Sequence, residues 1–366
     1  TVVAGYGYSW QVALLAVFIE GLIFIVLSLT NIREAIFNAI PLTLKKGVSV
    51  GIGLFIAFIG LQNSGLCVDS ATLVGIISFP ENFHTAGICA LLTLIGLFFT
   101  AVFYTRKMKG AILYGILLTW ILGMLCQVTG LYVPTPDAGF YSLFPSWGMT
   151  DFSKLGLTFG QCFNVDFSAV GIVNFIVVIF SFLFVDIFDT LGTLIGVATK
   201  AKMLDKDGKL PGIKPALLAD SIATSAGAIL GTSTTTTFVE SASGVAVGGR
   251  TGLTALVTGI LFLVSTLFAP IFTAIPSFAT APALIMVGFL MVGTVTEINF
   301  DLDNLTESIP AYLAIIAMPL FYSISEGISL GVISYVLLNV AAGKGKKVAP
   351  LMYVLAVLFV LKYIFL

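Results

Sequence analysis

Apolar runs of about 20 residues recur along this chain and constrain its fold more than any other feature, because each can cross a hydrocarbon core of about 30 Å as a helix. Of the 366 residues, 58% are hydrophobic and only 10% are charged, whereas soluble domains carry about 25% charged residues. The runs do not alternate apolar and polar residues, which argues against a transmembrane β-barrel. We therefore expect an all-α polytopic membrane protein.

The runs predict eleven membrane spans, with a long loop rich in proline, glycine and aromatic residues at about 130–167. Fifteen of the 17 Lys and Arg residues, Arg33 and Lys45 among them, fall on one side of the alternating topology. Only Lys154 and Lys362 fall elsewhere. Because cytoplasmic loops carry such an excess of positive charge, we expect the basic loops to be cytoplasmic. The predicted spans are residues 11–29, 47–63, 86–104, 110–128, 170–198, 212–230, 251–270, 281–298, 305–321, 325–341 and 347–366.

Two short matches within the chain indicate an internal repeat. The segment GLIFIVLSL at 21–29 matches GILFLVSTL at 259–267, and FNAIP at 37–41 matches FTAIP at 272–276. The predicted topology runs the first copy inward and the second copy outward, and such an inverted repeat is typical of secondary transporters. The register pairs Thr1 with a position inside the second copy, so we expect about 70 or more residues to precede Thr1 in the complete protein.

The composition does not favour nucleic-acid binding, redox chemistry or a metal site. The formal net charge is −1, which provides no basic surface, so we expect no nucleic-acid partner. The single histidine, His84, lies in a polar loop, where a surface role is the simplest interpretation. No pair among the four cysteines has CxxC spacing, so we expect no metal or redox centre. The cysteines are Cys67, Cys89, Cys126 and Cys162.

Five carboxylates lie within or beside the predicted membrane spans: Glu20, Asp186, Asp189, Asp220 and Glu240. Each needs a structural or functional reason, because inserting a charged residue into a membrane costs about 2.5–3.5 kcal/mol. Asp220 lies on a predicted helix with a small-residue face, which usually packs against another helix. We expect a structural or relay role for Asp220 and a structural role for Glu20.

Asp186 and Asp189 are three residues apart, and this spacing places both on one face of a helix. Two buried carboxylates this close resist ionising together, so one of them can carry a proton near neutral pH. That property suits a proton-coupled carrier. The alternative is a structural carboxylate that accepts hydrogen bonds from Ser or Thr of a neighbouring helix.

The stretch GTSTTTTFVESASGVAVGGRTG, residues 231–252, differs from its apolar surroundings. β-Branched threonines favour extended backbone, so we expect a short strand at 234–238 near the membrane midplane. We expect a half-helix at about 239–248 to follow, with Glu240 in its first turn, where it can accept hydrogen bonds from a ligand. The alternative is a threonine-rich kink with a capping glutamate.

Three segments in this order, LSLTNIREAIFNAIP, FVDIFDTLGTLIG and GTSTTTTFVESASGVAVGGRTGLTALVTG, resemble the adenine/guanine/hypoxanthine permeases. These form the AzgA-like branch of the nucleobase–cation symporters, within the nucleobase–ascorbate transporter superfamily, and the similarity covers essentially the whole chain. The resemblance implies proton-coupled uptake of hypoxanthine, guanine and adenine across the cell membrane. It implies no enzyme activity and no cofactor other than the proton gradient, and it is compatible with a homodimer in the lipid bilayer.

The resemblance also implies a fold with two inverted repeats of seven helices, a core domain, a gate domain and two short strands at midplane half-helices. Mapped onto this chain, it assigns 1–44 and 168–279 to the core domain and 45–130 and 280–366 to the gate domain. Residues 131–167 form an external loop in this assignment.

In the family, carboxylates on two helices hold the nucleobase, and these positions correspond to Asp189 in DTLGT and Glu240 in FVES. A carboxylate can accept two N–H donors of a purine at once, and an aromatic ring can stack on the base. The further candidates are Thr237, Phe238 and Val239 for contacts with the base, Asp186 for the coupled proton alongside Asp189 and Glu240, and Thr193 with Asp220 for structural or relay roles.

Two other functions are alternatives. The same fold could carry uracil or xanthine, whereas two acidic groups do not suit an inorganic anion such as sulfate. An intramembrane aspartyl protease would also use two aspartates, but it needs a GxGD-type motif, and Asp220 in LLADSIA lacks those glycines.

Overall fold

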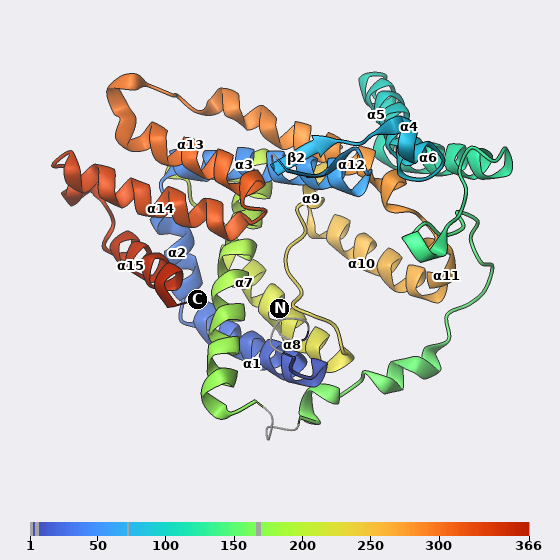
Figure 1. The fold of residues 1–366 in the computed structure, drawn as a ribbon. Coiled ribbons are helices and arrows are strands. Elements are labelled where there is room, and N and C mark those ends of the chain that lie inside the picture. The colour runs from blue at the N-terminus through green and yellow to red at the C-terminus, as the bar shows by residue number, and fades with distance from the viewer. Residues whose placement is uncertain (1–2, 4–6, 72, 166–169, 366) are drawn as a thin grey trace. The chain divides into compact units, whose positions relative to one another are not determined.

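The computed structural model describes residue 3 and residues 7–71, 73–165 and 170–365, which are predominantly helical (Figure 1). Within this described part, eight helices are long and apolar enough to cross a membrane. The predicted junction between the external loop and the core domain, at 166–169, lies outside the described residues. These spans comprise α1 (Trp10–Leu29), α3 (Leu42–Asn63), α5 (Ile88–Thr105) with the turns from Phe79 before it, α6 (Ala111–Val128), α7 (Ile172–Lys200), α8 (Ile213–Leu230), α12 (Ser277–Val292) with the turn to Glu297 after it, and α14 (Ile324–Ala341).

Three shorter apolar helices, α10 (Gly252–Leu267), α13 (Leu305–Leu320) and α15 (Pro350–Phe365), coincide with the remaining predicted spans. The all-α polytopic architecture expected from the sequence is therefore confirmed. The connecting elements are α2 (Ile32–Ala39), α4 (Phe79–Asn82), η1 (Phe83–Gly87), η2 (Pro136–Ala138), η3 (Phe152–Leu157), η4 (Gln161–Phe163), α9 (Ser241–Ala246), α11 (Ala269–Phe272), η5 (Gly293–Glu297), η6 (Leu302–Asn304) and η7 (Gly345–Lys347).

The chain divides into two compact units. The first unit comprises Thr1–Ile52, Asp151–Val239 and Thr294–Leu366, and the second comprises Gly53–Thr150 and Glu240–Gly293. These boundaries differ from those of the predicted core and gate domains. The core and gate domains are defined by which helices move together during transport, so their assignment stays a prediction. The inverted repeat also stays a prediction.

In the first unit, α1 lies along α8, α13 lies along α14, and α7 contacts both α1 and α14 (Figure 1). Glycines allow the close approach: a Cβ on Gly21 of α1 would stand 2.8 Å from the amide nitrogen of Ser225 in α8. Small residues at such contacts are typical of helix pairs in membranes. The position of α7 between two helix pairs lets its carboxylates reach different neighbours.

In the second unit, α5, α6 and α12 pack against one another. A Cβ on Gly288 of α12 would stand 2.4 Å from the carbonyl oxygen of Gly53, so the backbones of α12 and α3 are in close contact. A hairpin of β1 (Cys67–Ser70) and β2 (Leu73–Ile76) follows α3, with Cys67 opposite Ile76 in an antiparallel register.

The predicted strand at 234–238 is non-helical but is not paired as a strand. A strand requires a ladder with a partner, and the one sheet among the described residues is the β1–β2 hairpin. The predicted half-helix is present but shorter than expected, because α9 begins at Ser241 and ends at Ala246, before Gly248 adopts a φ of 112°.

Two of the basic residues counted for the predicted topology are buried inside the first unit. Arg33 is 0% exposed and Lys45 is 1% exposed. The Nζ atom of Lys45 donates a hydrogen bond of 2.6 Å to the carbonyl oxygen of Gly208 and lies over the ring of Phe37. Arg33 and Lys45 therefore pack inside the protein, and the cytoplasmic side of the basic loops stays a prediction.

Candidate functional site

A buried polar cluster lies in the first unit, where α7 approaches α8. The Asp186 side chain of α7 belongs to a residue that is only 5% exposed, and its Oδ1 accepts a hydrogen bond of 3.3 Å from the Oγ1 of Thr190. Thr190 also lies 3.5 Å from the Oδ2 of Asp220 in α8. One threonine hydroxyl therefore links two carboxylates that are 34 residues apart in the sequence.

Asp220 is neutralised by an arginine. The Nη2 of Arg33 and the Oδ2 of Asp220 form an ion pair of 3.1 Å, and the Nη1 of Arg33 donates to the Oγ of Ser221 at 2.9 Å. The guanidinium also lies 4.3 Å from the centroid of the Phe24 ring. These contacts offset much of the free energy that burial of the Arg33 and Asp220 charges costs. They support the structural or relay role predicted for Asp220.

Glu20 of α1 faces the same cluster and is 0% exposed. Its Oε2 accepts a hydrogen bond of 3.3 Å from the Oγ1 of Thr234, which lies 214 residues later. Its charge interacts with those of Asp186, Arg33 and Asp220. A sequence pattern could not reveal this contact, because no local spacing relates positions so far apart; the only signal is an acid inside an apolar span.

Asp189 lies one turn after Asp186 on α7 but has different neighbours. The backbone amide of Ser325 donates a hydrogen bond to its carboxylate, and Lys362 of α15 supplies a nearby positive charge. Lys362 in turn pairs with Glu326 of α14. The shared helix face predicted from the spacing therefore divides, with Asp186 toward α8 and Asp189 toward α14 and α15.

The threonine-rich stretch is fixed to α8 at two points. The amide of Thr237 donates to the carboxylate of Asp220, and the Oγ1 of Thr224 donates a hydrogen bond of 2.9 Å to the carbonyl oxygen of Thr235. Phe238 is 60% exposed, whereas Val239 is buried. The stretch therefore exposes an aromatic ring while its threonines contact the polar cluster.

Glu240 begins the second unit and is exposed. It is the residue before α9 rather than a member of its first turn, and its carbonyl oxygen accepts a hydrogen bond of 2.9 Å from the amide of Ser243. Asp189 and Glu240 belong to different compact units, so their joint contact with one base stays a prediction. Thr193, predicted as structural or relay, is buried in α7.

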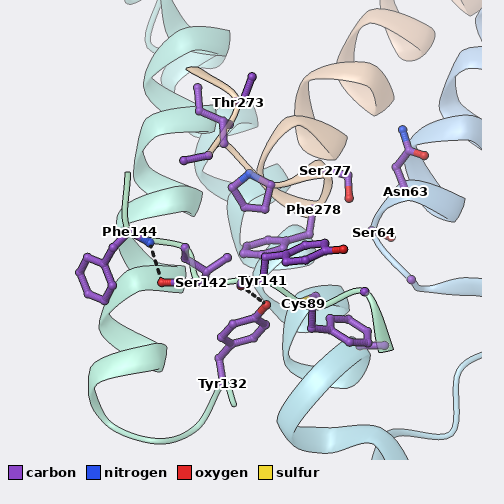
Figure 2. Close-up of a pocket in the computed structure, with 18 of the residues that line it drawn as sticks. Asn63, Ser64, Cys89, Tyr132, Tyr141, Ser142, Phe144, Thr273, Ser277 and Phe278 are labelled. Carbon is purple, nitrogen blue, oxygen red and sulfur yellow. Dashed lines mark hydrogen bonds between the residues drawn. The ribbon is translucent and has the colours of Figure 1, made fainter. Parts of the chain in front are cut away.

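A cavity of 690 Å³ lies in the second unit, and none of the predicted site residues lines it (Figure 2). Its lining residues include no charged side chain, and several of them belong to the loop at 131–167. The Tyr132 hydroxyl donates to the carbonyl oxygen of Tyr141 at 2.8 Å, and burial raises the pKa of Tyr132 to about 12. This hydroxyl therefore remains a donor at physiological pH.

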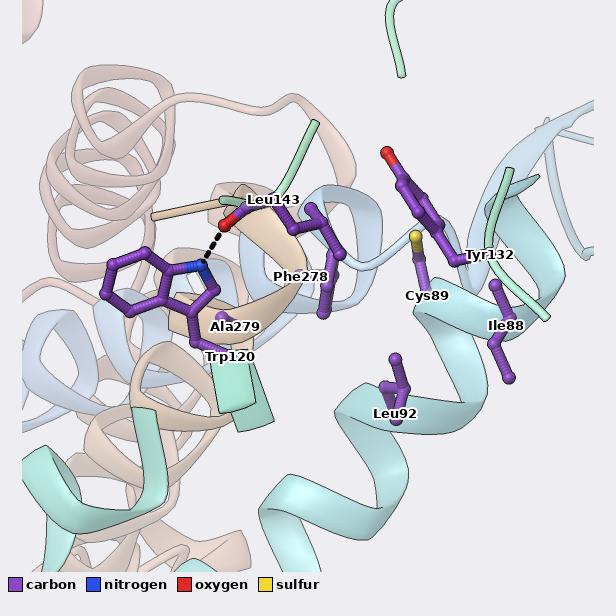
Figure 3. Close-up of a cluster of buried hydrophobic side chains, with 8 residues drawn as sticks. All are labelled: Ile88, Cys89, Leu92, Trp120, Tyr132, Leu143, Phe278 and Ala279. Carbon is purple, nitrogen blue, oxygen red and sulfur yellow. Dashed lines mark hydrogen bonds between the residues drawn. The ribbon is translucent and has the colours of Figure 1, made fainter. Parts of the chain in front are cut away.

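The loop packs on a cluster of apolar side chains that shares Tyr132, Leu143 and Phe278 with the cavity lining (Figure 3). The indole Nε1 of Trp120 donates a hydrogen bond of 2.9 Å to the carbonyl oxygen of Leu143, and Cys89 lies among the buried members with Phe278. These contacts fix the loop to α5, α6 and α12. We interpret the cavity as part of this loop attachment, since it lacks the ionisable groups of the α7 cluster.

Helices that span a membrane and enclose buried, paired ionisable residues are typical of transport proteins, in which such residues mark ion and substrate pathways. Residues 1–330 match the model of the permease family labelled Xan_ur_permease. The chain belongs to this family and is therefore a permease rather than an enzyme.

Three relatives illustrate the similarity. The guanine/hypoxanthine permeases PbuG and PbuO of Bacillus subtilis are 47% and 43% identical, over 98% and 96% of this chain and 76% and 77% of their own lengths. The adenine permease AdeQ of Escherichia coli is 39% identical over 99% of this chain and 76% of its own length. The predicted membership of a nucleobase permease family is confirmed, and the aspartyl protease alternative is excluded.

Proposed function

We propose that this chain is a proton-coupled symporter that takes up purine nucleobases, namely hypoxanthine, guanine and adenine, across the cell membrane. The observation that carries the proposal is the match of 96–99% of the chain with relatives named as guanine/hypoxanthine and adenine permeases. The buried carboxylates on α7 support it, because a carrier of a neutral base and a proton needs acceptors for both.

In this proposal, Asp189 and Glu240 accept hydrogen bonds from ring N–H and exocyclic NH₂ groups of the base. The amide of Ser325 leaves the remaining lone pairs of the Asp189 carboxylate for a ligand. Phe238, which is 60% exposed, stacks on the base. The backbone of Thr237 and Val239 completes the contacts, and Thr193 supports α7 from within.

Movement of a core domain against a gate domain alternates access to the base site. In this scheme the loops that carry most of the basic residues face the cytoplasm. A homodimer is the proposed assembly, and mass measurement of the purified protein in detergent tests it directly.

Uptake into cells that lack their own purine permeases tests the substrate class. Cells that express the protein should accumulate labelled hypoxanthine, and unlabelled guanine or adenine should compete whereas uracil should not. Competition by uracil or xanthine with little effect of the other purines would replace this substrate assignment with the pyrimidine or xanthine alternative.

A further inference from the structure

The buried cluster of the first unit contains more negative than positive charge. Glu20, Asp186 and Asp220 supply three carboxylates, and their charges interact with one guanidinium, that of Arg33. With all four ionised, the cluster would carry a net charge of −2 in a water-poor interior, where an uncompensated charge is costly. One or more protons or cations must therefore reside there in the resting protein.

The pairing within the cluster shows where the missing positive charge belongs. Arg33 forms its ion pair with Asp220 at 3.1 Å, so this carboxylate is already neutralised. Glu20 and Asp186 have no comparable ion pair among the described residues and receive only threonine hydroxyls, from Thr234 and Thr190. The excess negative charge therefore lies on Glu20 and Asp186.

Each of these two carboxylates also has one buried oxygen without a hydrogen-bond partner in the described part of the chain. These atoms are the Oε1 of Glu20 and the Oδ2 of Asp186. The two residues are 0% and 5% exposed, respectively. A buried acceptor without a donor is destabilising, whereas a protonated carboxyl group supplies an O–H donor for a neighbouring carboxylate.

A proton fits this place better than a metal ion. Among the described residues, no three His, Cys, Asp or Glu side chains are grouped so that they could hold a metal ion. A proton requires only two oxygens. We propose that Glu20 and Asp186 together hold the proton that drives transport, at a site separate from the base-binding carboxylates Asp189 and Glu240. This inference rests on the proposed symport and identifies where its coupling ion binds.

Three other charged residues act on the pair. Asp220 and Arg33 act on both carboxylates, and Asp189 acts on Asp186 from the same helix. Because the paired Asp220 and Arg33 largely cancel each other, the carboxylates of Glu20 and Asp186 determine the charge of the site. Loss of the proton leaves both carboxylates ionised and mutually repulsive.

The proton site is connected to the base-binding stretch by direct contacts. Thr234 donates to Glu20, and three residues later the amide of Thr237 donates to Asp220. Phe238 and Val239, which are proposed to contact the base, come directly after Thr237 in the sequence. An ionised carboxylate accepts the Thr234 hydrogen bond more strongly than a protonated carboxyl group does, so protonation of Glu20 weakens this contact and releases the stretch to bind the base. Proton and base then each raise the affinity for the other, as reciprocal coupling requires.

Infrared spectroscopy of the purified protein in lipid tests proton occupancy without a substrate. At neutral pH we expect the carbonyl stretch of a protonated carboxylic acid, and Glu20→Gln or Asp186→Asn should remove it. Glu81→Gln, at an exposed glutamate of α4, is the matched control and should leave the band unchanged. Absence of the band in the wild-type protein overturns the inference and requires no variant.

Transport by the same variants tests the coupling. Glu20→Gln should lower concentrative hypoxanthine uptake by about tenfold or more, while exchange of labelled for unlabelled base across the membrane persists, because exchange needs no net proton movement. Glu20→Asp keeps a carboxyl group and should restore protonophore-sensitive uptake. Concentrative uptake by Glu20→Gln that still collapses with a protonophore overturns the inference. Failure of the wild-type protein to carry purines would refute the proposed function instead, and the infrared band would still decide the proton site.

Discussion

Arg33 of α2 and Asp220 of α8 are 187 residues apart in the sequence, yet they form an ion pair of 3.1 Å with both side chains sealed from solvent. In this cluster of three carboxylates, Arg33 neutralises Asp220. Glu20 and Asp186 have no ion pair of this kind among the described residues. In the proposed mechanism, Asp220 is therefore a structural acid, whereas Glu20 and Asp186 hold the proton.

Loss of the Arg33 side chain should strongly destabilise the first unit. Arg33→Met leaves Asp220 charged, buried and unpaired, so we expect the free energy of unfolding to fall by about 3–5 kcal/mol. The double variant Arg33→Met with Asp220→Leu removes both charges and should lose clearly less. Thermal unfolding in detergent measures both, and an equal loss in the single and double variants would contradict the burial argument.

Substitution of either proposed base ligand should weaken substrate binding. Asp189→Asn and Glu240→Gln each exchange a charged acceptor for a neutral amide, and hydrogen bonds to charged groups are worth about 1.5–3 kcal/mol. We expect the KM for hypoxanthine to rise by about 10- to 100-fold in each variant. Initial uptake rates at increasing base concentration provide the measurement, with Glu81→Gln as control. An unchanged KM in both variants would remove these residues from the site.

Close contact between α3 and α12 should make Gly288 intolerant of any side chain. A Cβ there would lie 2.4 Å from the carbonyl oxygen of Gly53 and 3.0 Å from the amide nitrogen of Ala57, and backbone atoms cannot rotate away. Gly288→Ala should therefore lower the melting temperature. Gly259→Ala in α10, where a Cβ meets no atom within 4 Å, is the matched control and should leave it unchanged. Equal melting temperatures for the two variants would show that the helices lie further apart.

The Tyr132 hydroxyl should stabilise the loop at 131–167 in a pH-dependent way. Burial raises its pKa from 10.0 to about 12, so the folded protein favours the protonated phenol. The resulting stabilisation is fully present below pH 10 and is lost as the pH rises toward 12. Tyr132→Phe also removes the hydrogen bond to Tyr141, worth about 1 kcal/mol.

Comparison of wild-type and Tyr132→Phe stability across this alkaline range isolates the effect of Tyr132. The difference between the two proteins should shrink as the phenol of the wild type becomes deprotonated. A difference that stays constant from neutral to alkaline pH would show that the hydroxyl is solvated rather than buried.

The helices of this protein could be predicted from the sequence because their signal is local. An uninterrupted apolar run specifies a membrane helix by its own composition, and the eleven predicted spans all coincide with helices. The strand expected from the β-branched residues at 234–238 was harder to predict, because a strand depends on a partner elsewhere and propensity alone does not supply one.

The polar cluster could be predicted only in part. The positions of Asp186 and Asp189 follow from their spacing, but their division between α8 and α14 depends on which helices pack on either side of α7. The burial of Arg33 could not be predicted, because a basic residue beside a span resembles a charge in a loop. Its ion-pair partner, Asp220, is also distant in the sequence. Glu20 was recognised as a carboxylate within a span, but its contact with Thr234 could not be predicted, since Thr234 lies 214 residues away.

The most direct test of proton-coupled purine transport is uptake of labelled hypoxanthine by cells that express this protein, measured with and without a protonophore. Concentrative uptake that collapses when the proton gradient is abolished is the predicted result. Hypoxanthine uptake that is indifferent to the protonophore would remove the proton from the mechanism, and no purine uptake by protein verified in the membrane would contradict the proposed substrate.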